Sequence, residues 1–217
     1  MYIDLHTHSS ASDDSRASVE QFAQWCTVLR QKGYKIDGFV LTEHRQFNID
    51  IDYSELSNKY DVLILKGAEL DTNCGHFLVY GINKQLHDLI NFDDINFDAN
   101  HLLEICIANS AIAIPAHPGR EGIGLVEFIN QNSMLIDKLS IVEGLNGSNR
   151  PNENMRTENM LKKFNYFTTG GSDAHIVSSI GSCMTYFKES ISSEEDLVQA
   201  LKNGEFQAVT IDETIYR

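Results

Sequence analysis

Two short segments, one near each end of the chain, bring an acid and imidazoles close together. The first is DLHTH, Asp4 to His8, and the second is GGSDAH, Gly170 to His175. Side chains two residues apart on extended or turning backbone can lie on one side of the chain. The glycines before Asp173 permit a sharp turn and a close approach to a bound group. We expect the two segments to meet and to contribute to one metal site.

Other residues that could bind a metal follow or open apolar, β-prone runs. They are His6 and His8 after residues 2–5, His44 after 38–41, Glu69 after 62–65, His76 before 77–80, His117 after 111–115, and Asp173 and His175 after 166–169. The carboxyl ends of parallel strands meet at one face, where active sites are built. With Asp13, these residues give nine nitrogen and oxygen ligands. His87 and His101 lie in helical or loop stretches, away from the other candidate ligands in the sequence, so we expect structural roles for them.

Nine ligands are more than one ion can use, because a catalytic zinc takes about three protein ligands. We therefore expect two or three divalent ions, with at least one bridging carboxylate. Imidazoles mixed with carboxylates suit zinc, manganese or iron. Sites with two such metals most often hydrolyse phosphate esters, and sometimes amides.

Apolar runs and amphipathic stretches alternate along the chain. Strands are expected at 2–5, 38–41, 62–65, 77–80, 111–115, 139–142, 166–169, 183–187 and 206–209, and helices at 18–32, 53–59, 99–109, 121–131, 152–164 and 193–203. Ser192 and Glu195 fit a capping box for the last helix, and Gly204 fits its end. The alternation predicts an α/β fold with a parallel sheet. Six or seven units fall short of an eightfold barrel, which favours a distorted or incomplete barrel in a single domain, residues 1–217.

The overall composition excludes several classes of function. The net charge of −14 argues against general binding to nucleic acid or to an anionic membrane. No apolar stretch approaches the ~20 residues of a membrane span, and the first residues do not form a secretory signal, so a cytoplasmic protein is expected. The four cysteines are spread without a C-x-x-C pair and do not predict a disulfide framework.

Four motifs occur in a recognisable order: DLHTHSSASD at 4–13, TEH at 42–44 with GAE at 67–69, AHP at 116–118, and GSDAH at 171–175. With these motifs the sequence resembles the PHP family, the polymerase and histidinol phosphatase superfamily of metal-dependent phosphoesterases. The resemblance spans almost the whole chain. It implies a single PHP domain with a distorted (βα)7 barrel of mostly parallel strands and a trinuclear metal site at their C-terminal ends.

The resemblance also implies a role for each ligand. His6, His8, Glu69 and Asp173 would hold one ion and form the catalytic set; Glu69 would bridge to a second ion held by His76 and His117; and Asp13, His44 and His175 would hold the third. We choose Asp13 rather than Asp14 because Ser12-Asp13 stands where the family has its Ser-Asp pair. Glu43 stands where the family usually has aspartate, and is expected to orient an imidazole.

The expected reaction is hydrolysis of a phosphate ester by a hydroxide that bridges two ions. Arginine suits the phosphate because its planar fork binds two oxygens. Among four loop arginines, Arg16, Arg45, Arg120 and Arg150, we favour Arg120 and Arg150 as substrate-binding residues, and we expect Glu143 and Asn146 to line the pocket.

A small phosphomonoester is the expected substrate. Only ~40 residues separate His76 from His117, too few for the inserted domain with which some family members cap nucleotides, and the chain is acidic. Three alternatives remain: a nuclease or phosphodiesterase acting on the end of a short oligonucleotide, a catalytically silent PHP-fold binding module, and a hydrolase of a non-phosphate bond.

Overall fold

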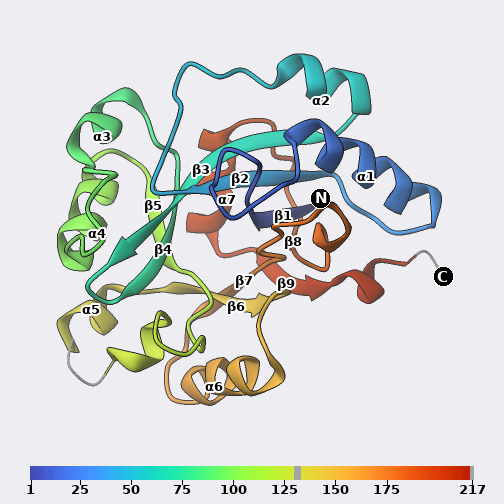
Figure 1. The fold of residues 1–217 in the computed structure, drawn as a ribbon. Helices are drawn as coiled ribbons and strands as arrows, with labels where there is room; N and C mark the ends of the chain where they lie inside the picture. The colour runs from blue at the N-terminus through green and yellow to red at the C-terminus, as the bar shows by residue number, and fades with distance from the viewer. Residues whose placement is uncertain (130–132, 216–217) are drawn as a thin grey trace.

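The computed structural model describes residues 1–129 and 133–215 (Figure 1). The strands are β1 (Tyr2–Thr7), β2 (Gly38–His44), β3 (Leu63–Thr72), β4 (Gly75–Tyr80), β5 (Ile112–Pro115), β6 (Ile141–Asn146), β7 (Phe167–Gly171), β8 (Cys183–Phe187) and β9 (Phe206–Thr210). The helices are α1 (Val19–Gln31), α2 (Ser54–Tyr60), α3 (Lys84–Leu89), α4 (Ala99–Ala108), α5 (Ser133–Lys138), α6 (Pro151–Leu161) and α7 (Glu194–Asn203), with short 3-10 turns η1 (Leu125–Glu127), η2 (Val177–Ser179) and η3 (Ile211–Thr214).

Seven strands form one mixed sheet in the order β5-β4-β3-β2-β1-β8-β9, and β6 and β7 form a separate parallel pair. Within the large sheet, β1, β2 and β3 are parallel, whereas the flanking pairs are antiparallel. The pair β6-β7 lies across the opening of the curled sheet (Figure 1). The end of β7 meets β1 there, where the amide of Asp173 donates to the carbonyl of His6 at 2.7 Å and the amide of His8 donates to that of Ala174 at 3.0 Å.

The α/β class is confirmed, but the described residues do not form the expected distorted (βα)7 barrel of mostly parallel strands. Instead, the curled sheet is a half-barrel of mixed strand direction. One reason lies between β3 and β4, where only Asn73 and Cys74 connect the two strands. A connection this short can join only antiparallel strands, since a parallel neighbour needs a crossover of a dozen residues.

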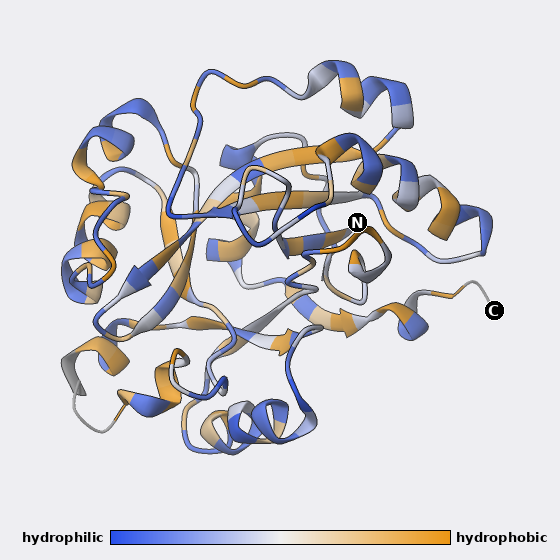
Figure 2. Cartoon of the chain, in the orientation of Figure 1, coloured by the Kyte–Doolittle hydropathy of each residue, from blue (hydrophilic) through white to orange (hydrophobic). Residues whose placement is uncertain are grey.

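Helices cover the outer face of the curled sheet, and α7 closes one end of the space inside the curl. Alternate strand residues such as Val40, Leu65 and Leu78 point inward and pack with Leu197 and Leu201 of α7. On the outer face, α3 and α4 cover one half of the sheet and α1 and α2 cover the other. Figure 2 shows the matching pattern, with apolar strands between helices whose outer surfaces are largely hydrophilic. No helix in the described part of the chain is both long and apolar enough to cross a membrane.

The inward face of the strands changes from apolar to polar toward one end. Because strand side chains alternate with a period of two, residues at i and i+4 share a face. His44 therefore stands above Val40 on β2, and Glu69 above Leu65 on β3. On β4, which runs the other way, His76 lies four residues before Tyr80. The same pleat that builds the apolar core thus carries the polar residues to one rim.

Some expected elements differ in the structure. The helix expected at 121–131 is reduced to η1, and positions 130 and 131 lie outside the described residues. The helices α3 and α5 were not expected from the sequence. The cap of α7 is Ser193, whose hydroxyl accepts from the amide of Asp196 at 3.1 Å, one position later than expected. Ser192 instead donates to the Asp196 carboxylate, so both serines hold the first turn.

Candidate metal centre

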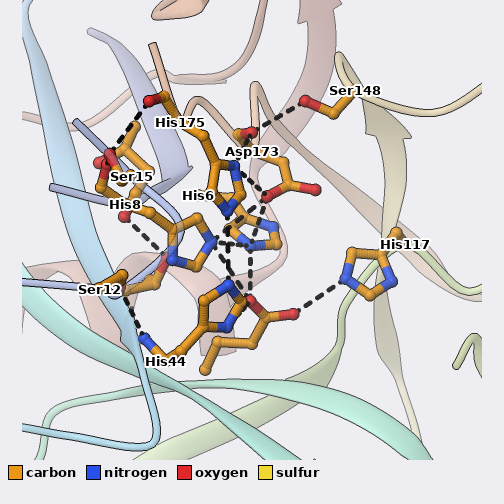
Figure 3. Close-up of polar contacts among 12 residues, drawn as sticks. His6, His8, Ser12, Ser15, His44, His117, Ser148, Asp173 and His175 are labelled. Carbon is orange, nitrogen blue, oxygen red and sulfur yellow. Dashed lines mark hydrogen bonds and ion pairs between the residues drawn. The ribbon is translucent and has the colours of Figure 1, made fainter. Parts of the chain in front are cut away.

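Eight of the nine predicted ligands converge at the rim of the half-barrel. Figure 3 shows how His6, His8, His44, His117, Asp173 and His175 lie around one place. The eight ligands form four overlapping groups, each with its ligand atoms within 4.8 Å of one another: His8, His44 and His175; His6, His117 and Asp173; His6, His8 and Glu69; and Glu69, His76 and His117. Residues from both ends of the chain therefore meet, as the spacing of DLHTH and GGSDAH indicated.

The first ligand set surrounds one point deep in the centre. The Nε2 atoms of His6 and His8 lie 3.0 Å apart. Glu69 Oε2 lies 3.3 Å from the first and 3.2 Å from the second. Asp173 Oδ1 lies 3.5 Å and 3.3 Å from the same two nitrogens. All four side chains are almost completely buried. Two imidazoles and two carboxylates at these distances suit a transition-metal or zinc ion.

The second set shares Glu69 through its other oxygen. Oε1 lies 2.9 Å from Nδ1 of His76 and 2.9 Å from Nε2 of His117. The two oxygens of one buried carboxylate therefore face two different groups of imidazoles. This is the arrangement expected of a carboxylate that bridges two ions.

The third set includes Asp14 rather than Asp13. His44 Nε2 and His175 Nε2 are 3.4 Å apart, and Asp14 Oδ2 lies 3.2 Å and 3.1 Å from them. Asp13 is exposed and makes no ion pair with any described residue. The structure therefore brings Asp14 next to His44 and His175, and not Asp13, which we predicted from its place beside Ser12. The Ser12 hydroxyl is used otherwise, since it accepts from the amide of His44 at 3.0 Å.

Glu143 and Asn146, expected to line the pocket, lie directly behind the ligands. Glu143 Oε1 is 2.9 Å from Nδ1 of His6, and its Oε2 accepts from the amide of His117 at 2.6 Å. Asn146 donates to that same oxygen at 2.9 Å. A carboxylate at the outer nitrogen fixes the tautomer and the direction of a ligand imidazole.

Glu43 does not orient an imidazole as predicted. Its carboxylate accepts from the amide of Ser9 at 3.1 Å and from the hydroxyl of Ser12 at 2.6 Å. It therefore holds the loop that follows β1, which carries Asp14. The imidazole-orienting role belongs to Glu143, which the sequence placed only near the pocket.

The hydrogen-bond pattern of the imidazoles fits bound cations. The outer nitrogens of His6 and His175 face acceptors, Glu143 and the carbonyl of Asp173 at 3.0 Å, so their inner Nε2 atoms carry lone pairs in the neutral form. These lone pairs point at other nitrogens and at carboxylate oxygens. Such a concentration of acceptors in a buried place is costly unless a proton or a metal lies among them. The donor set therefore fits divalent ions.

Electrostatics lead to the same conclusion. Burial alone would lower the pKa of His6, but the carboxylates of Glu143, Asp173 and Glu69 raise it well above its usual value. Burial would likewise raise the pKa of Glu69, yet the surrounding histidines, His6 first, hold it well below the usual range. The site thus favours positive charge among its carboxylates, which protons or metal ions can supply.

The two favoured arginines border an open depression of about 450 Å³ next to the centre, lined also by Glu121, Ser148 and Glu153. Arg120 Nη2 lies 2.7 Å from Asp173 Oδ2 and also donates to Asn146 at 3.0 Å. Arg150 is exposed at the start of α6. Arg120 therefore touches a predicted ligand, whereas Arg150 is free to meet a molecule entering from solvent.

Asp4 is a site residue whose role the sequence did not indicate. It is fully buried and accepts from three backbone amides, those of Ser172 at 2.8 Å, Gly181 at 2.8 Å and His6 at 3.2 Å. Burial raises the pKa of this carboxyl to about 6. Asp4 joins the two ends of the chain next to the ligands. The position of Asp4 in DLHTH marks it as a possible site residue. Spacing alone does not show whether such a carboxylate binds a metal or holds backbone segments together.

Residues 151–206 match the PHP-associated family model PHP_C. The fold is similar to PsfC from Pseudomonas syringae PB-5123, with a TM-score of 0.71 and 17% identity over 98% of this chain and 92% of that one. It is also similar to a two-domain protein from Bacteroides vulgatus that contains a predicted PHP-like metal-dependent phosphoesterase (TM-score 0.65, 18% identity, 98% of this chain and 65% of that one). The lesion-specific endonuclease PfuEndoQ from Pyrococcus furiosus gives a TM-score of 0.68 at 16% identity, covering 95% of this chain and 57% of that one. No curated protein matches the chain.

These comparisons confirm the resemblance to the PHP superfamily that the four motifs indicated. Identities of 16 to 18% establish a shared fold and do not carry a substrate from one protein to another. The chain spans less than two thirds of the Bacteroides and Pyrococcus proteins.

Proposed function

We propose that this protein is a metal-dependent phosphoesterase of the PHP type, with two or three zinc, manganese or iron ions held by His6, His8, Asp14, His44, Glu69, His76, His117, Asp173 and His175. The observation that supports this most is the shared use of Glu69, whose two oxygens face separate groups of imidazoles. Ions in such a site activate water and polarise the phosphate oxygens.

The protein's own residues then bind and orient the substrate. Arg120 and Arg150 border the depression, and each offers a planar fork that fits phosphate oxygens. Two residues of its lining, Arg120 and Ser148, contact Asp173. Arg120 also holds the outer oxygen of Asp173, which leaves Oδ1 directed at His6 and His8. Phosphate bound beside Arg120 would therefore lie next to the first ligand set.

A small phosphomonoester is our preferred substrate class. The depression is open and of modest size, about 450 Å³, which suits a compact molecule. The net charge of −14 opposes long-range attraction of a polyanion such as duplex DNA. Local arginines and bound cations can still attract a single phosphate group.

Cleavage of a nucleic acid is the second candidate, because one structure of similar fold is an endonuclease Q complex with a 27-mer duplex carrying an abasic lesion at the active site. This chain covers 57% of that protein. The two candidates differ in the substrate that reaches the same metal centre.

The deciding experiment compares substrates on one metal-loaded preparation. We expect manganese- or zinc-stimulated release of p-nitrophenol from its phosphate monoester, and release of phosphate from mononucleotides or sugar phosphates. His8→Ala and Asp173→Ala should abolish turnover, whereas His87→Ala, a histidine outside the centre, should not. Activity on oligonucleotides alone would replace the small substrate with a nucleic acid. Full metal loading without hydrolysis of any phosphate ester would favour a silent binding module.

A further inference from the structure

His76 differs from His6, His8 and His117 in the ring nitrogen that it directs inward. Its Nδ1 lies 2.9 Å from Glu69 Oε1. The inward atom of His6, His8 and His117 is instead Nε2. The two nitrogens of an imidazole point in different directions, so an ion between His76, Glu69 and His117 would be bound through Nδ1 of His76.

The outer nitrogen of His76 faces a carboxylate that is not a predicted ligand. Asp71 Oδ1 lies 3.3 Å from His76 Nε2. The two residues are direct cross-strand partners in the β3-β4 hairpin, so the backbone register brings their side chains together. Rotating the ring by half a turn would place carbon atoms against both carboxylates. Glu69 and Asp71 together therefore select the observed ring orientation.

Asp71 is itself held by an arginine that directly follows β2. Arg45 Nη1 donates to Asp71 Oδ2 at 2.8 Å. Arg45 follows His44 directly and has a left-handed backbone with φ of 48°, and its amide donates to the carbonyl of Glu69 at 2.8 Å. This uncommon conformation for a non-glycine residue places the side chain over β3. Arg45 is thus occupied beside the second ligand set, away from the depression formed by Arg120 and Arg150.

We propose that Asp71 and Arg45 are positioning residues for the second ion: Asp71 accepts a hydrogen bond from Nε2 of His76, which leaves Nδ1 free to bind the metal, and Arg45 holds the Asp71 carboxylate in place. This inference rests on the proposed metal centre. Outer carboxylates of this kind typically strengthen metal binding by 10- to 100-fold. Since Arg45 is joined to His44 and Asp71 acts on His76, the pair also links the third ligand set to the second.

The test measures metal binding rather than turnover. Metal-free wild type, Asp71→Asn, Asp71→Ala and Arg45→Gln are titrated with zinc, and bound ions are counted after dialysis. We expect the two Asp71 variants to bind one ion about 10- to 100-fold more weakly, with a smaller loss in Arg45→Gln. Asp88→Ala is the matched control, because it removes a carboxylate 3.7 Å from His87, outside the centre. Circular dichroism checks that each variant is folded.

A second readout reports on the ring itself. In the zinc-loaded wild type, long-range proton–nitrogen NMR spectra should show His76 protonated at Nε2 and bound through Nδ1, with the signals assigned by His76→Gln. Binding through Nε2, or unchanged affinity for every ion in both Asp71 variants, would overturn the inference while leaving the phosphoesterase proposal intact. A wild-type protein that binds no zinc would overturn both.

Discussion

At the scale of single residues, Glu69 determines how the centre is divided. Its Oε2 is close to His6 and His8 and lies 3.1 Å from His44 Nδ1, whereas its Oε1 serves His76 and His117. One fully buried carboxylate therefore contacts imidazoles of all three ligand sets. Its negative charge is compensated only when cations lie among those rings.

The choice between the adjacent aspartates gives a direct test of the third ligand set. Asp14→Asn should remove or strongly weaken one ion, because Asp14 Oδ2 lies 3.2 Å from His44 and 3.1 Å from His175. Asp13→Asn, which removes the same charge one residue earlier, should leave all ions bound. Elemental analysis after dialysis against dilute metal measures the difference. If Asp13→Asn loses the ion and Asp14→Asn keeps it, our assignment of the third ligand set is wrong.

The sequence could not decide between these two aspartates. Both fit the spacing, and the path of their loop is determined by distant contacts: Ser12 donates to Glu43, and Ser15 donates to the carbonyls of His8 and His175. The convergence of the other eight predicted ligands could be predicted, because the strands place them at one rim. Outer partners such as Glu143 and Asp71 require the three-dimensional pairing of strands, which residue type alone does not give.

Proton release should accompany metal binding at His44. Burial alone would lower its pKa, but Glu69 raises it from 6.5 to about 9 in the metal-free protein. A metal needs the neutral imidazole, so below about pH 9 binding must release this proton. Calorimetry in buffers of different ionisation heat should show at least one proton released at about pH 7.5, with less release as the pH rises through 9. Release that does not change with pH would contradict the assignment.

The raised pKa of His44 also determines whether the metal-free protein gains or loses stability as the pH rises. A histidine whose pKa is raised on folding stabilises the fold fully below its unfolded pKa of 6.5, and this contribution is lost as the pH rises through about 9. Metal-free protein should therefore become less stable across that range, as measured by denaturant unfolding. Metal-saturated protein should not follow this trend, because metal affinity grows as the protons leave.

At the scale of elements, irregular backbone at the strand ends directs the ligands. His117 and Asp173 have left-handed backbone, with φ of 28° and 53°, just beyond β5 and β7. The pairing of β1 with β2 shifts register between Asp4 and Thr7, so β1 carries one extra residue where His6 lies. Bulges of this kind redirect side chains beside active sites. Alternation of apolar residues predicts strand positions well, but it does not predict these local departures or the antiparallel pairings.

Gly171 offers a test of how strand packing supports the centre. A Cβ at this position would lie 2.6 Å from Glu143 Oε1 and closer still to His6 Cβ. Gly171→Ala should therefore displace the Glu143–His6 contact, lower the free energy of unfolding by about 1–3 kcal/mol and weaken metal binding.

Gly33→Ala is the comparison for Gly171→Ala. It carries a left-handed φ of 93° with open space around it, so it should cost about 1–2 kcal/mol through backbone strain alone and leave metal affinity unchanged. Denaturant unfolding and zinc titration separate the two effects. Equal metal affinity in both variants would show that β7 can move without disturbing His6.

At the scale of the whole molecule, the centre joins parts of the chain that are distant in sequence. Its predicted ligands lie in β1, β2, β3 and β4 or just beyond β1, β5 and β7, that is, on both sides of the opening in the half-barrel. The large sheet and the β6-β7 pair are separate ladders, joined near the centre by Thr7 and Ala174. Bound ions should therefore act as cross-links that close the half-barrel.

Removal of the ions should lower thermal stability more than the loss of a surface ligand would. An ion present at 100 times its dissociation constant stabilises the fold by about 2.7 kcal/mol, which for a chain of this size corresponds to roughly 5–10 °C in Tm. Scanning calorimetry with and without a chelator measures this shift. The His8→Ala, Asp173→Ala double variant is the control, and its Tm should respond much less. A cross-link that stabilises only the folded state must raise Tm in proportion to its binding free energy. If the chelator does not change the Tm of the wild type, the half-barrel is closed by protein contacts alone.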